Sequence, residues 1–395
     1  MQNKKGLIRT AIRETDFILL LLCLAASIYG IIMVFSATKA DIVEDALMSR
    51  DTQAMIVAVG LGALMAIMIS FIDYNFITKM YPVIGIVCLL FMLALFIPGV
   101  GKGPVERPDA KTWIAVPGTG FFFQPSELLK IGFTITFGMH LELVYDHLGQ
   151  IKHILFLCIH AAVPTGLVII TGDLGSALVF MIIFIVMMFC AGVRLRYFVI
   201  GLAGITAAIP IVWYFLFSDI QKDRFLALFY PDLYEDLLYQ QNRGMEAIRN
   251  GGLTGQGLFN GLYTQAGTVP ESENDMIFTC IAEELGLLGG IAALILLLAI
   301  VLRTMYVGKK SKKTATTLMC YGFAAMIAGQ VIINLGMCMK ILPVIGITLP
   351  FFSAGGSSNI CIYIGIGLIL SIYRYDKEKE VINYRISNIT PFDNY

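Results

Sequence analysis

The sequence predicts an all-α polytopic membrane protein with ten transmembrane helices in one domain that spans residues 1–395. Of its 395 residues, 57% are hydrophobic and 14% are charged, whereas soluble proteins carry roughly 25% charged residues. Apolar stretches of about 20 residues, the length that crosses a bilayer, recur along the whole chain. These stretches are residues 17–35, 54–72, 81–97, 125–143, 154–170, 174–190, 197–217, 276–303, 315–337 and 350–373.

Basic residues mark one side of the predicted membrane domain. Lysines and arginines precede the first stretch, follow the tenth, and lie between the sixth and seventh and between the eighth and ninth. Because cytoplasmic loops carry such an excess, we expect both termini (residues 1–16 and 374–395) in the cytoplasm and the protein in the cytoplasmic membrane. The basic clusters therefore indicate topology and not binding of nucleic acid.

The first stretch is expected to remain in the protein as a signal anchor. It is too long, and lacks the small-residue cleavage site, for a removable signal peptide. All eight cysteines fall within apolar stretches and form no CxxC pair, which is typical of small buried side chains and not of disulfides or a metal site. Function is therefore expected in the outer loops and in polar groups within the spans.

The fourth stretch begins with two opposite charges, Glu127 and Lys130. Three residues apart, they lie on one face of a helix and can pair. Charges inside a membrane protein indicate a polar interior or a cavity, although a salt bridge that only holds the bundle together is an equal alternative. Just before this stretch, Trp113 is typical of an interfacial aromatic belt. Asp173 is placed to cap the sixth helix, and it also faces the same compartment as Asp275.

The longest hydrophilic interval, residues 218–275, is predicted to be a large outer loop between the seventh and eighth helices. It contains Arg224, Arg243 and Arg249. Guanidinium groups can grip a pyrophosphate through paired hydrogen bonds, or they can meet anionic lipid headgroups. The glycine-rich segment 251–257 lacks the Gly-Lys-Ser/Thr ending of a phosphate loop, and we interpret it as a flexible or tightly turning segment.

Asp275 is the predicted reactive group. It stands where the acidic end of the large loop passes into the eighth apolar stretch, and a carboxylate at such a boundary is costly without a use or a partner. If the helix runs unbroken from Asp275, Glu283 lies about 12 Å deeper and about 80° round the axis. Paired carboxylates of a glycosidase lie about 5–9.5 Å apart, so this spacing argues against hydrolysis.

The connection between the ninth and tenth helices contains two prolines and a Gly-Gly-Ser-Ser run that break regular helix. Such backbone is tolerated at membrane depth only where protein or a water-filled cavity satisfies it. We therefore expect a hydroxyl-rich groove wall that includes Ser353 and Ser357. Lys340 is a further polar candidate at the start of this connection.

At this point the residues resemble a known family, the SEDS proteins RodA, FtsW and SpoVE. The resemblance covers nearly the whole chain in order. It rests on QPSELLK (124–130), GDLGSA (172–177), the DRF…YPD…YQQ…GGLTGQG run (223–257), PE…NDMIF…EELG (270–286) and LPVIGITLPFFSAGGSS (342–358). The FFSAGGSS ending and the short polar tail are more similar to RodA.

The resemblance implies a peptidoglycan glycosyltransferase that polymerises lipid II at the outer face of the membrane, for cell elongation or division. It also implies a class B penicillin-binding protein as partner, which cross-links the peptides. By motif position, Asp275 matches the essential aspartate of the family, and Glu127 and Lys130 match its buried ion pair. Glu271, in the same motif as Asp275, is a candidate for substrate binding.

The chemistry expected from this resemblance uses Asp275 as general base, with one or more of the three arginines on the departing undecaprenyl pyrophosphate. A divalent cation such as Mg²⁺ is a candidate helper, although the sequence contains no ligand cluster for it. Two alternatives belong to other classes. One is a transporter that moves lipid II between leaflets, and the other is a non-catalytic scaffold for the penicillin-binding protein.

Overall fold

The computed structural model describes residues 15–42, 47–103, 110–115, 118 and 122–389. Helices dominate it, and the described residues add one small antiparallel sheet in the order β1-β2-β3. The main elements are α2 (Phe17–Ala37), α3 (Arg50–Ser70), α4 (Tyr74–Lys79), α5 (Tyr81–Ala94), β1 (Gly101–Lys102), β2 (Trp113–Ala115), β3 (Phe122–Phe123), α6 (Pro125–Leu143), α7 (Ile151–Ile170), α8 (Leu174–Cys190), α9 (Leu195–Ile211), α10 (Asp219–Phe229), α11 (Glu235–Gly251), α12 (Leu262–Gln265), α13 (Ile277–Lys310), α14 (Thr314–Cys338) and α15 (Gly356–Ile389).

Short helical turns complete the chain between these elements. They are η1 (Lys39–Asp41), η2 (Tyr145–His147), the π-helical η3 (Val212–Leu216) and η4 (Pro231–Leu233).

Seven helices in the described ranges are long and apolar enough to cross a membrane. By the length and composition of these helices, the chain is a multi-pass membrane protein. They are α2, α3, α7, α9 with its continuation to Phe215, α13, α14 and the part of α15 up to Lys377. Helices α5 and α8 are apolar but shorter, and α6 carries buried charges. Each predicted apolar stretch overlaps one of these helices. The tenth was expected from residue 350, but α15 begins only at Gly356. Before it, the amides of Phe352 and Ser353 both donate to the carbonyl of Leu349 at 3.1 Å, which makes a separate turn.

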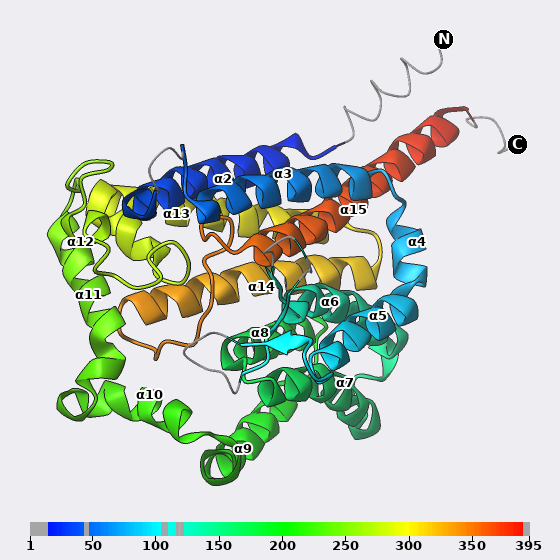
Figure 1. Cartoon of the computed structure of the whole chain (residues 1–395). Helices are drawn as coiled ribbons and strands as arrows, with labels where there is room; N and C mark the ends of the chain where they lie inside the picture. Colours follow the sequence, from blue (N-terminus) through cyan, green and yellow to red (C-terminus); the bar gives the residue numbers. More distant parts are fainter. Residues whose placement is uncertain (1–14, 43–46, 104–109, 116–117, 119–121, 390–395) are drawn as a thin grey trace, which may run out of the picture.

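Helix α14 lies in the middle of the bundle (Figure 1) and packs against α13, α8 and α6. Small residues permit these close approaches, because helices within lipid associate mainly through tight packing. A Cβ atom added to Gly138 of α6 would lie 2.8 Å from Met319 of α14. Helix α15 packs chiefly along α3. As a result, α14 and α15 are the most buried spans, with 72% and 78% of their apolar windows inside the protein.

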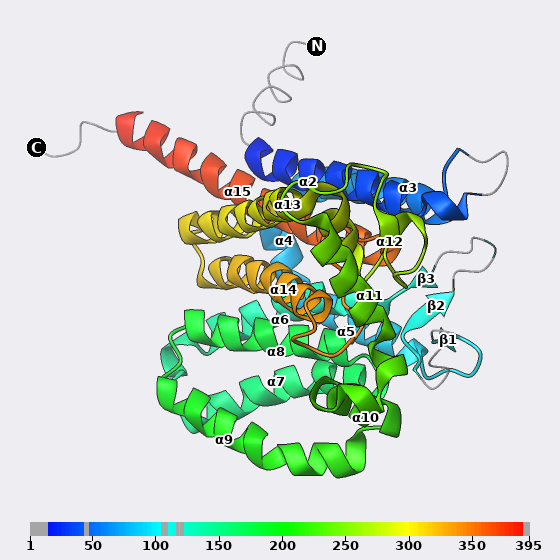
Figure 2. The ribbon, with the colours of Figure 1, turned by 90° about the vertical axis from the view of Figure 1, so that its left-hand side faces the viewer.

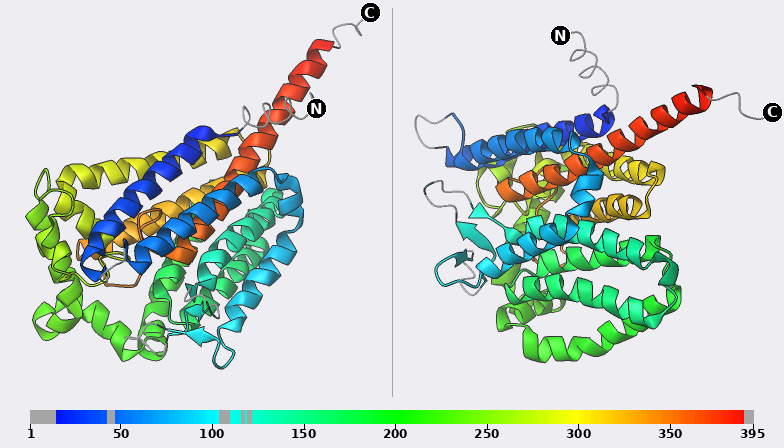
Figure 3. Two further views of the ribbon diagram at one scale, coloured as in Figure 1. Left: turned by 45° about the horizontal axis from the view of Figure 1, so that its top comes forward. Right: turned by 90° about the vertical axis from the view of Figure 1, so that its right-hand side faces the viewer.

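The two ends of the bundle differ. The start of α2 and the far end of α15 lie at one end, whereas α10, α11 and α12 lie at the other (Figure 1). The small sheet also lies away from the end of α15, as the right view of Figure 3 shows. We call the two ends the terminal end and the loop end.

Helix α9 lies at the periphery of the bundle (Figure 2), and its main contact is with η3, which continues it. None of its residues is buried. A helix that is apolar on all sides and covered by no protein is stable only where lipid surrounds it.

Helix α13 is broken at Gly286, whose φ of 70° lies in the left-handed region. The break frees backbone groups that a straight helix would pair internally. The turn of residues 251–257 supplies their partners. Its amides donate to the carbonyls of Glu283 and Glu284, at 3.0 and 2.9 Å, and its carbonyls accept from the amides of residues 287 and 288, at 2.9 and 3.2 Å. The glycine-rich segment is therefore a turn that docks on the broken helix.

Candidate active site

Asp275 lies in a turn of residues 270–276 (the aspartate turn), immediately before α13 begins at Ile277. The prediction that the helix runs unbroken from Asp275 is therefore wrong at both points, since it starts later and breaks at Gly286. Asp275 is half-buried at the loop end of the bundle. Its backbone carbonyl accepts a hydrogen bond of 2.7 Å from the side-chain amide of Asn334 in α14.

The segment of residues 339–355 between α14 and α15 (the connecting loop) wraps the aspartate turn. The same Asn334 amide donates to the carbonyl of Ile347 at 2.8 Å. Ser353 Oγ donates to the carbonyl of Asn274 at 2.8 Å and accepts from the amide of Leu349 at 2.7 Å. The amide of Ala354 donates to the carbonyl of residue 273 at 2.9 Å. Ser353 thus fastens the turn that carries Asp275.

Gly346 of the connecting loop faces the carboxylate of Asp275. A Cβ atom built on Gly346 would lie 3.5 Å from Asp275 Oδ2. The φ of Gly346 is +75°, a conformation that glycine adopts without strain. At this point the backbone of the connecting loop, without a side chain, therefore lies beside the carboxylate.

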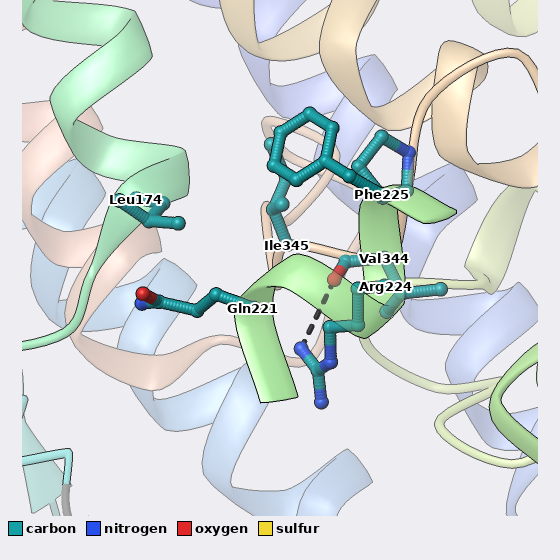
Figure 4. Close-up of a pocket in the computed structure, with 7 residues that line it drawn as sticks. Leu174, Gln221, Arg224, Phe225, Val344 and Ile345 are labelled. Carbon is teal, nitrogen blue, oxygen red and sulfur yellow. Dashed lines mark hydrogen bonds between the residues drawn. The ribbon is translucent and has the colours of Figure 1, made fainter. Parts of the chain in front are cut away.

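Arg224 is the predicted arginine that reaches this wall. It lies on α10, and its Nη1 donates to the carbonyl of Val344 at 3.0 Å (Figure 4). The guanidinium borders a small cavity between the start of α8, α10 and the connecting loop, lined by Leu174, Gln221, Phe225 and Pro343 among others. Arg224 is thus bound two residues from the glycine that faces Asp275.

Arg243 and Arg249 lie on α11 and do not share this place. Arg243 pairs with Glu246 at 2.7 Å. Its hydrogen bond to Glu246, and to a smaller extent its hydrogen bond to Tyr239, raise the pKa of its guanidinium. It borders an open groove of about 440 Å³ that also contains Asp232, Glu235 and Asp236. Arg249 is exposed. Six residues of helix turn Arg249 about 120° away from Arg243, so the two cannot grip one pyrophosphate from the same face.

Asp173 has the capping role that its position predicts. Its Oδ1 accepts from the amide of Ser176 at 2.9 Å, and its Oδ2 accepts from Gln124 and Ser126 at 2.8 and 3.0 Å. Ser357 accepts from the amide of Gln124 at 3.3 Å. Both buried side chains therefore join the starts of α6, α8 and α15 beneath the loop end.

Glu127 and Lys130 form the predicted pair, at 2.8 Å between Lys130 Nζ and Glu127 Oε1. Both side chains are buried, with 5% and 0% of their surface exposed. Helix α6, which carries the pair, packs against both α14 and α15.

Glu283, offered as a polar candidate, holds the large loop. It is fully buried and accepts four hydrogen bonds, from the side-chain amide of Asn250, from the amide of Tyr263, and from the amide and hydroxyl of Thr264. Its neighbour Glu284 accepts in the same way from Ser36, Phe259 and Gln265.

The remaining candidates lie on the rim of the loop end. Glu271 is exposed and accepts from Asn274 at 2.9 Å within the aspartate turn. Lys340 donates to Asn242 of α11 at 2.8 Å. Trp113 of β2 stands beside the ring of Phe122, with centroids 6.2 Å apart.

Gln241 is a functional-site residue that sequence reasoning missed. It is buried on α11, and its amide donates to the carbonyls of Met337 and Leu342, both at 2.8 Å. These contacts seat α11 over the end of α14 and the start of the connecting loop. Its residue type in a polar loop gives no signal, and only its place in the YQQ motif could have pointed to it. Asn334, in an apolar stretch, is a polar residue that composition singles out.

Comparison with known proteins gives one consistent result. A family model for FtsW, RodA and SpoVE, described as "Cell cycle protein", matches residues 16–378. The peptidoglycan glycosyltransferase MrdB of Escherichia coli K12 is 29% identical over 366 residues, which cover 92% of this chain and 94% of the relative. The probable peptidoglycan glycosyltransferase FtsW of Geobacter sulfurreducens is 31% identical over 378 residues, covering 93% and 97%.

Solved structures agree. A chain from a peptidoglycan synthase complex, described as coordinating polymerization and crosslinking, superimposes with a TM-score of 0.77 at 26% identity and covers 92% of this chain and 98% of that one. The rod shape determining protein RodA of Thermus thermophilus superimposes with a TM-score of 0.64 at 26% identity, covering 91% and 97%. The overall arrangement of the helices thus belongs to a known architecture. The chain is a member of the FtsW/RodA/SpoVE family.

Proposed function

We propose that this protein is a peptidoglycan glycosyltransferase that polymerises lipid II into glycan strands at the outer face of the cytoplasmic membrane. The observation that carries the proposal is the setting of Asp275. Its carboxylate faces a backbone wall at Gly346, on a turn that Asn334 and Ser353 hold in place. The curated relatives are named for this activity, and the match extends over more than nine tenths of each chain.

In the proposed reaction, a hydroxyl oxygen of one lipid-linked sugar attacks the anomeric carbon of a second. The new C–O bond forms as the bond from that carbon to the pyrophosphate breaks. Asp275 takes the hydroxyl proton as general base, a role typically worth about 10²–10⁴-fold in rate. The electron pair leaves with undecaprenyl pyrophosphate.

Arg224 is the arginine best placed to stabilise the leaving pyrophosphate, because it is bound to the loop that faces Asp275. A guanidinium is a planar fork of N–H donors that matches the geometry of a phosphate, and the bond to Val344 holds that of Arg224 at the connecting loop. In the described ranges, no three His, Cys, Asp or Glu side chains converge as metal ligands. A divalent cation such as Mg²⁺ would therefore take much of its coordination from the pyrophosphate itself.

The proposal places the loop end outside and the terminal end in the cytoplasm. Ten spans follow if α5, α6 and α8 also cross the bilayer, since they lie side by side with the long helices in all views (Figure 3). An even number returns both ends of the chain to one side, where the basic residues are expected. The whole chain is then one membrane domain, with its large outer loop between α9 and α13.

A class B penicillin-binding protein is the proposed partner. One of the structural relatives comes from a complex described as coordinating polymerization and crosslinking. A polymerase that delivers its strand to a cross-linking enzyme at the same membrane surface needs such a neighbour.

The test uses Asp275→Asn in the full-length protein, co-purified with its transpeptidase and supplied with purified lipid II. We expect polymer formation to fall at least 100-fold while the melting temperature and co-purification stay unchanged. Asp219→Asn is the matched control, because its carboxylate is 95% exposed on α10 at the same end of the bundle. Full activity of Asp275→Asn would refute the catalytic assignment.

The same preparation separates the alternatives. Movement of lipid II between leaflets without polymer, in wild-type protein, would identify a transporter. A scaffold would bind the transpeptidase and show no polymer with any variant.

A further inference from the structure

Gln330 has no hydrogen-bond partner although it is fully buried in α14. Neither its Oε1 nor its Nε2 has a protein partner among the described residues, and none of its surface is exposed. An unpaired amide in the interior of a membrane bundle loses its bonds to water without replacement. A residue kept under such a penalty points to a partner that completes it.

The register of α6 against α14 shows what lies beside Gln330. The helices run antiparallel, with the Cβ position of Gly322 2.9 Å from Thr134 and the Glu142 carboxylate accepting from the amide of Ala315 at 3.1 Å. In both pairs the two residue numbers add up to nearly the same value, 456 and 457, as expected for antiparallel helices in one register. Continued outward by two turns, this register sets Gln330 level with residues 126–127, and therefore level with the buried ion pair.

The register of α15 leads to the same level. The ring of Phe323 in α14 lies directly over Gly365 of α15. Because these helices are also antiparallel, seven residues outward from Phe323 bring Gln330 level with Ser358. Ser357 in turn bonds to the backbone at residue 124. Two independent contacts thus place the start of α6, the start of α15 and Gln330 in one layer.

The direction of the side chain follows from the helix period. Met319 marks the face of α14 that meets α6, and Phe323 marks the face that meets α15. At about 100° per residue, Gln330 projects midway between these two faces, about 20° from each. It is therefore aimed into the seam of α6 and α15, where Lys130 is fully buried and donates to Glu127 at 2.8 Å.

Asn334 lies one helical turn from Gln330 on α14, and its side-chain amide donates to the carbonyls of Asp275 and Ile347. An ammonium has three donors, so Lys130 can serve a second acceptor besides Glu127. One helix thus presents two amides in succession, the inner one toward the ion pair and the outer one toward the aspartate turn.

We propose that Gln330 is a positioning residue that binds the Glu127–Lys130 pair through one ordered water and so fixes the rotation and height of α14 beneath Asp275. A water-mediated bond serves nearly as well as a direct one. The proposal rests on the catalytic role proposed for Asp275. The ion pair would thus be linked to Gln330, and α14 would connect Gln330 rigidly to Asn334.

The first test measures stability and needs no activity. Gln330→Met keeps the volume and removes the amide. If the amide of Gln330 has no partner, its removal makes the variant more stable than the wild type. If the amide binds the ion pair, its removal makes the variant less stable. We expect the melting temperature of Gln330→Met to fall by several degrees. Thr304→Val is the matched control, because Thr304 Oγ1 is also buried without a partner, and its removal should leave the melting temperature equal or higher.

A double-mutant cycle with Lys130→Met identifies the partner. If Gln330 binds the pair, removal of its amide costs less once Lys130 is gone, so the two shifts are not additive. The cycle is measured in an Asp275→Asn background, where no polymerisation can occur. Additive shifts, or a rise in melting temperature for Gln330→Met, would overturn the proposal.

The second test measures polymerisation of lipid II with Asp275 intact. We expect Gln330→Met to lower kcat at least tenfold and to change KM less than twofold, because the amide positions the base and does not touch substrate. Thr304→Val should match the wild type. An unchanged kcat would overturn the positioning role. If the coupling to Lys130 is found but Asp275→Asn still polymerises, the ion-pair link stands and the proposed function fails.

Discussion

Replacement of Glu283 by glutamine tests whether the large outer loop is held by this buried carboxylate. Glu283 accepts four hydrogen bonds at 2.6–3.0 Å, two on each oxygen. Glutamine has almost the same shape but replaces one oxygen by a donor group. If that group takes the place of Oε2, the hydroxyl of Thr264 can turn and accept from it, but the amide of Thr264 then faces another donor. The opposite placement leaves two donors unpaired.

The expected cost follows from this count. At least one buried N–H loses its acceptor, at about 1–3 kcal/mol, and the bonds that remain lose the strengthening that a charged acceptor supplies. We therefore expect Glu283→Gln to lower the free energy of unfolding by about 2–4 kcal/mol. At about 2 °C per kcal/mol for a large domain, the melting temperature falls by about 4–8 °C.

The assay is thermal unfolding in detergent, paired with limited proteolysis of residues 250–265. We expect new cleavage in this segment at temperatures where the wild-type loop is protected. Glu271→Gln is the matched control, since Glu271 is exposed and accepts one bond, from Asn274. Such a surface change costs about 0.5 kcal/mol or less. A melting temperature of Glu283→Gln within 1 °C of the control would refute the reasoning.

Three further variants test other parts of the fold. Gly286 has a φ of +70°, and a Cβ added there would collide with Gly255. Gly286→Ala should therefore lower the yield of monodisperse protein on size exclusion. Gly204→Ala should not, because a Cβ at Gly204 meets nothing within 4 Å. Ser353→Ala removes the bond to the carbonyl of Asn274 in the aspartate turn and the bond that Ser353 accepts from Leu349, and lipid II polymerisation should slow several-fold while the protein stays folded. Lys130→Met leaves the buried carboxylate of Glu127 unpaired, which costs about 3–5 kcal/mol of stability, so the melting temperature should fall strongly. Adding Glu127→Gln to Lys130→Met removes that charge and should restore most of the melting temperature. Equal melting temperatures of the single and the double variant would contradict the ion pair.

The helices of this protein were predictable from the sequence, because a backbone within lipid must satisfy its own hydrogen bonds and so forms helix wherever an apolar stretch is long enough. The pairing of Glu127 with Lys130 was predictable for a related reason, since their spacing of three residues places them on one face. The choice of Asp275 came from its place where an acidic loop meets an apolar stretch, and the family motifs pointed to the same residue. None of these inferences needed contacts between distant segments.

The break in α13 was not predictable from its apolar pattern, which continues through Gly286. The left-handed turn exists because residues 251–257, some thirty positions earlier, dock there and pair its freed backbone groups. Glu283 and Glu284 acquire their structural role from residues on either side of this segment, between 250 and 265, and Glu284 also from Ser36 of α2. Local sequence contains neither partner, so the pattern showed two carboxylates without a function.

The sequence by itself determined that this chain is a helical membrane protein and which residues are chemically able to act. Only the tertiary structure decided among equivalent candidates. It bound Arg224 to the loop facing Asp275, placed Arg243 and Arg249 elsewhere, and put Gln330 level with the ion pair. The reason is physical: residue type and spacing set local geometry, whereas the partner of a buried polar group is chosen by the packing of helices that are distant in the chain.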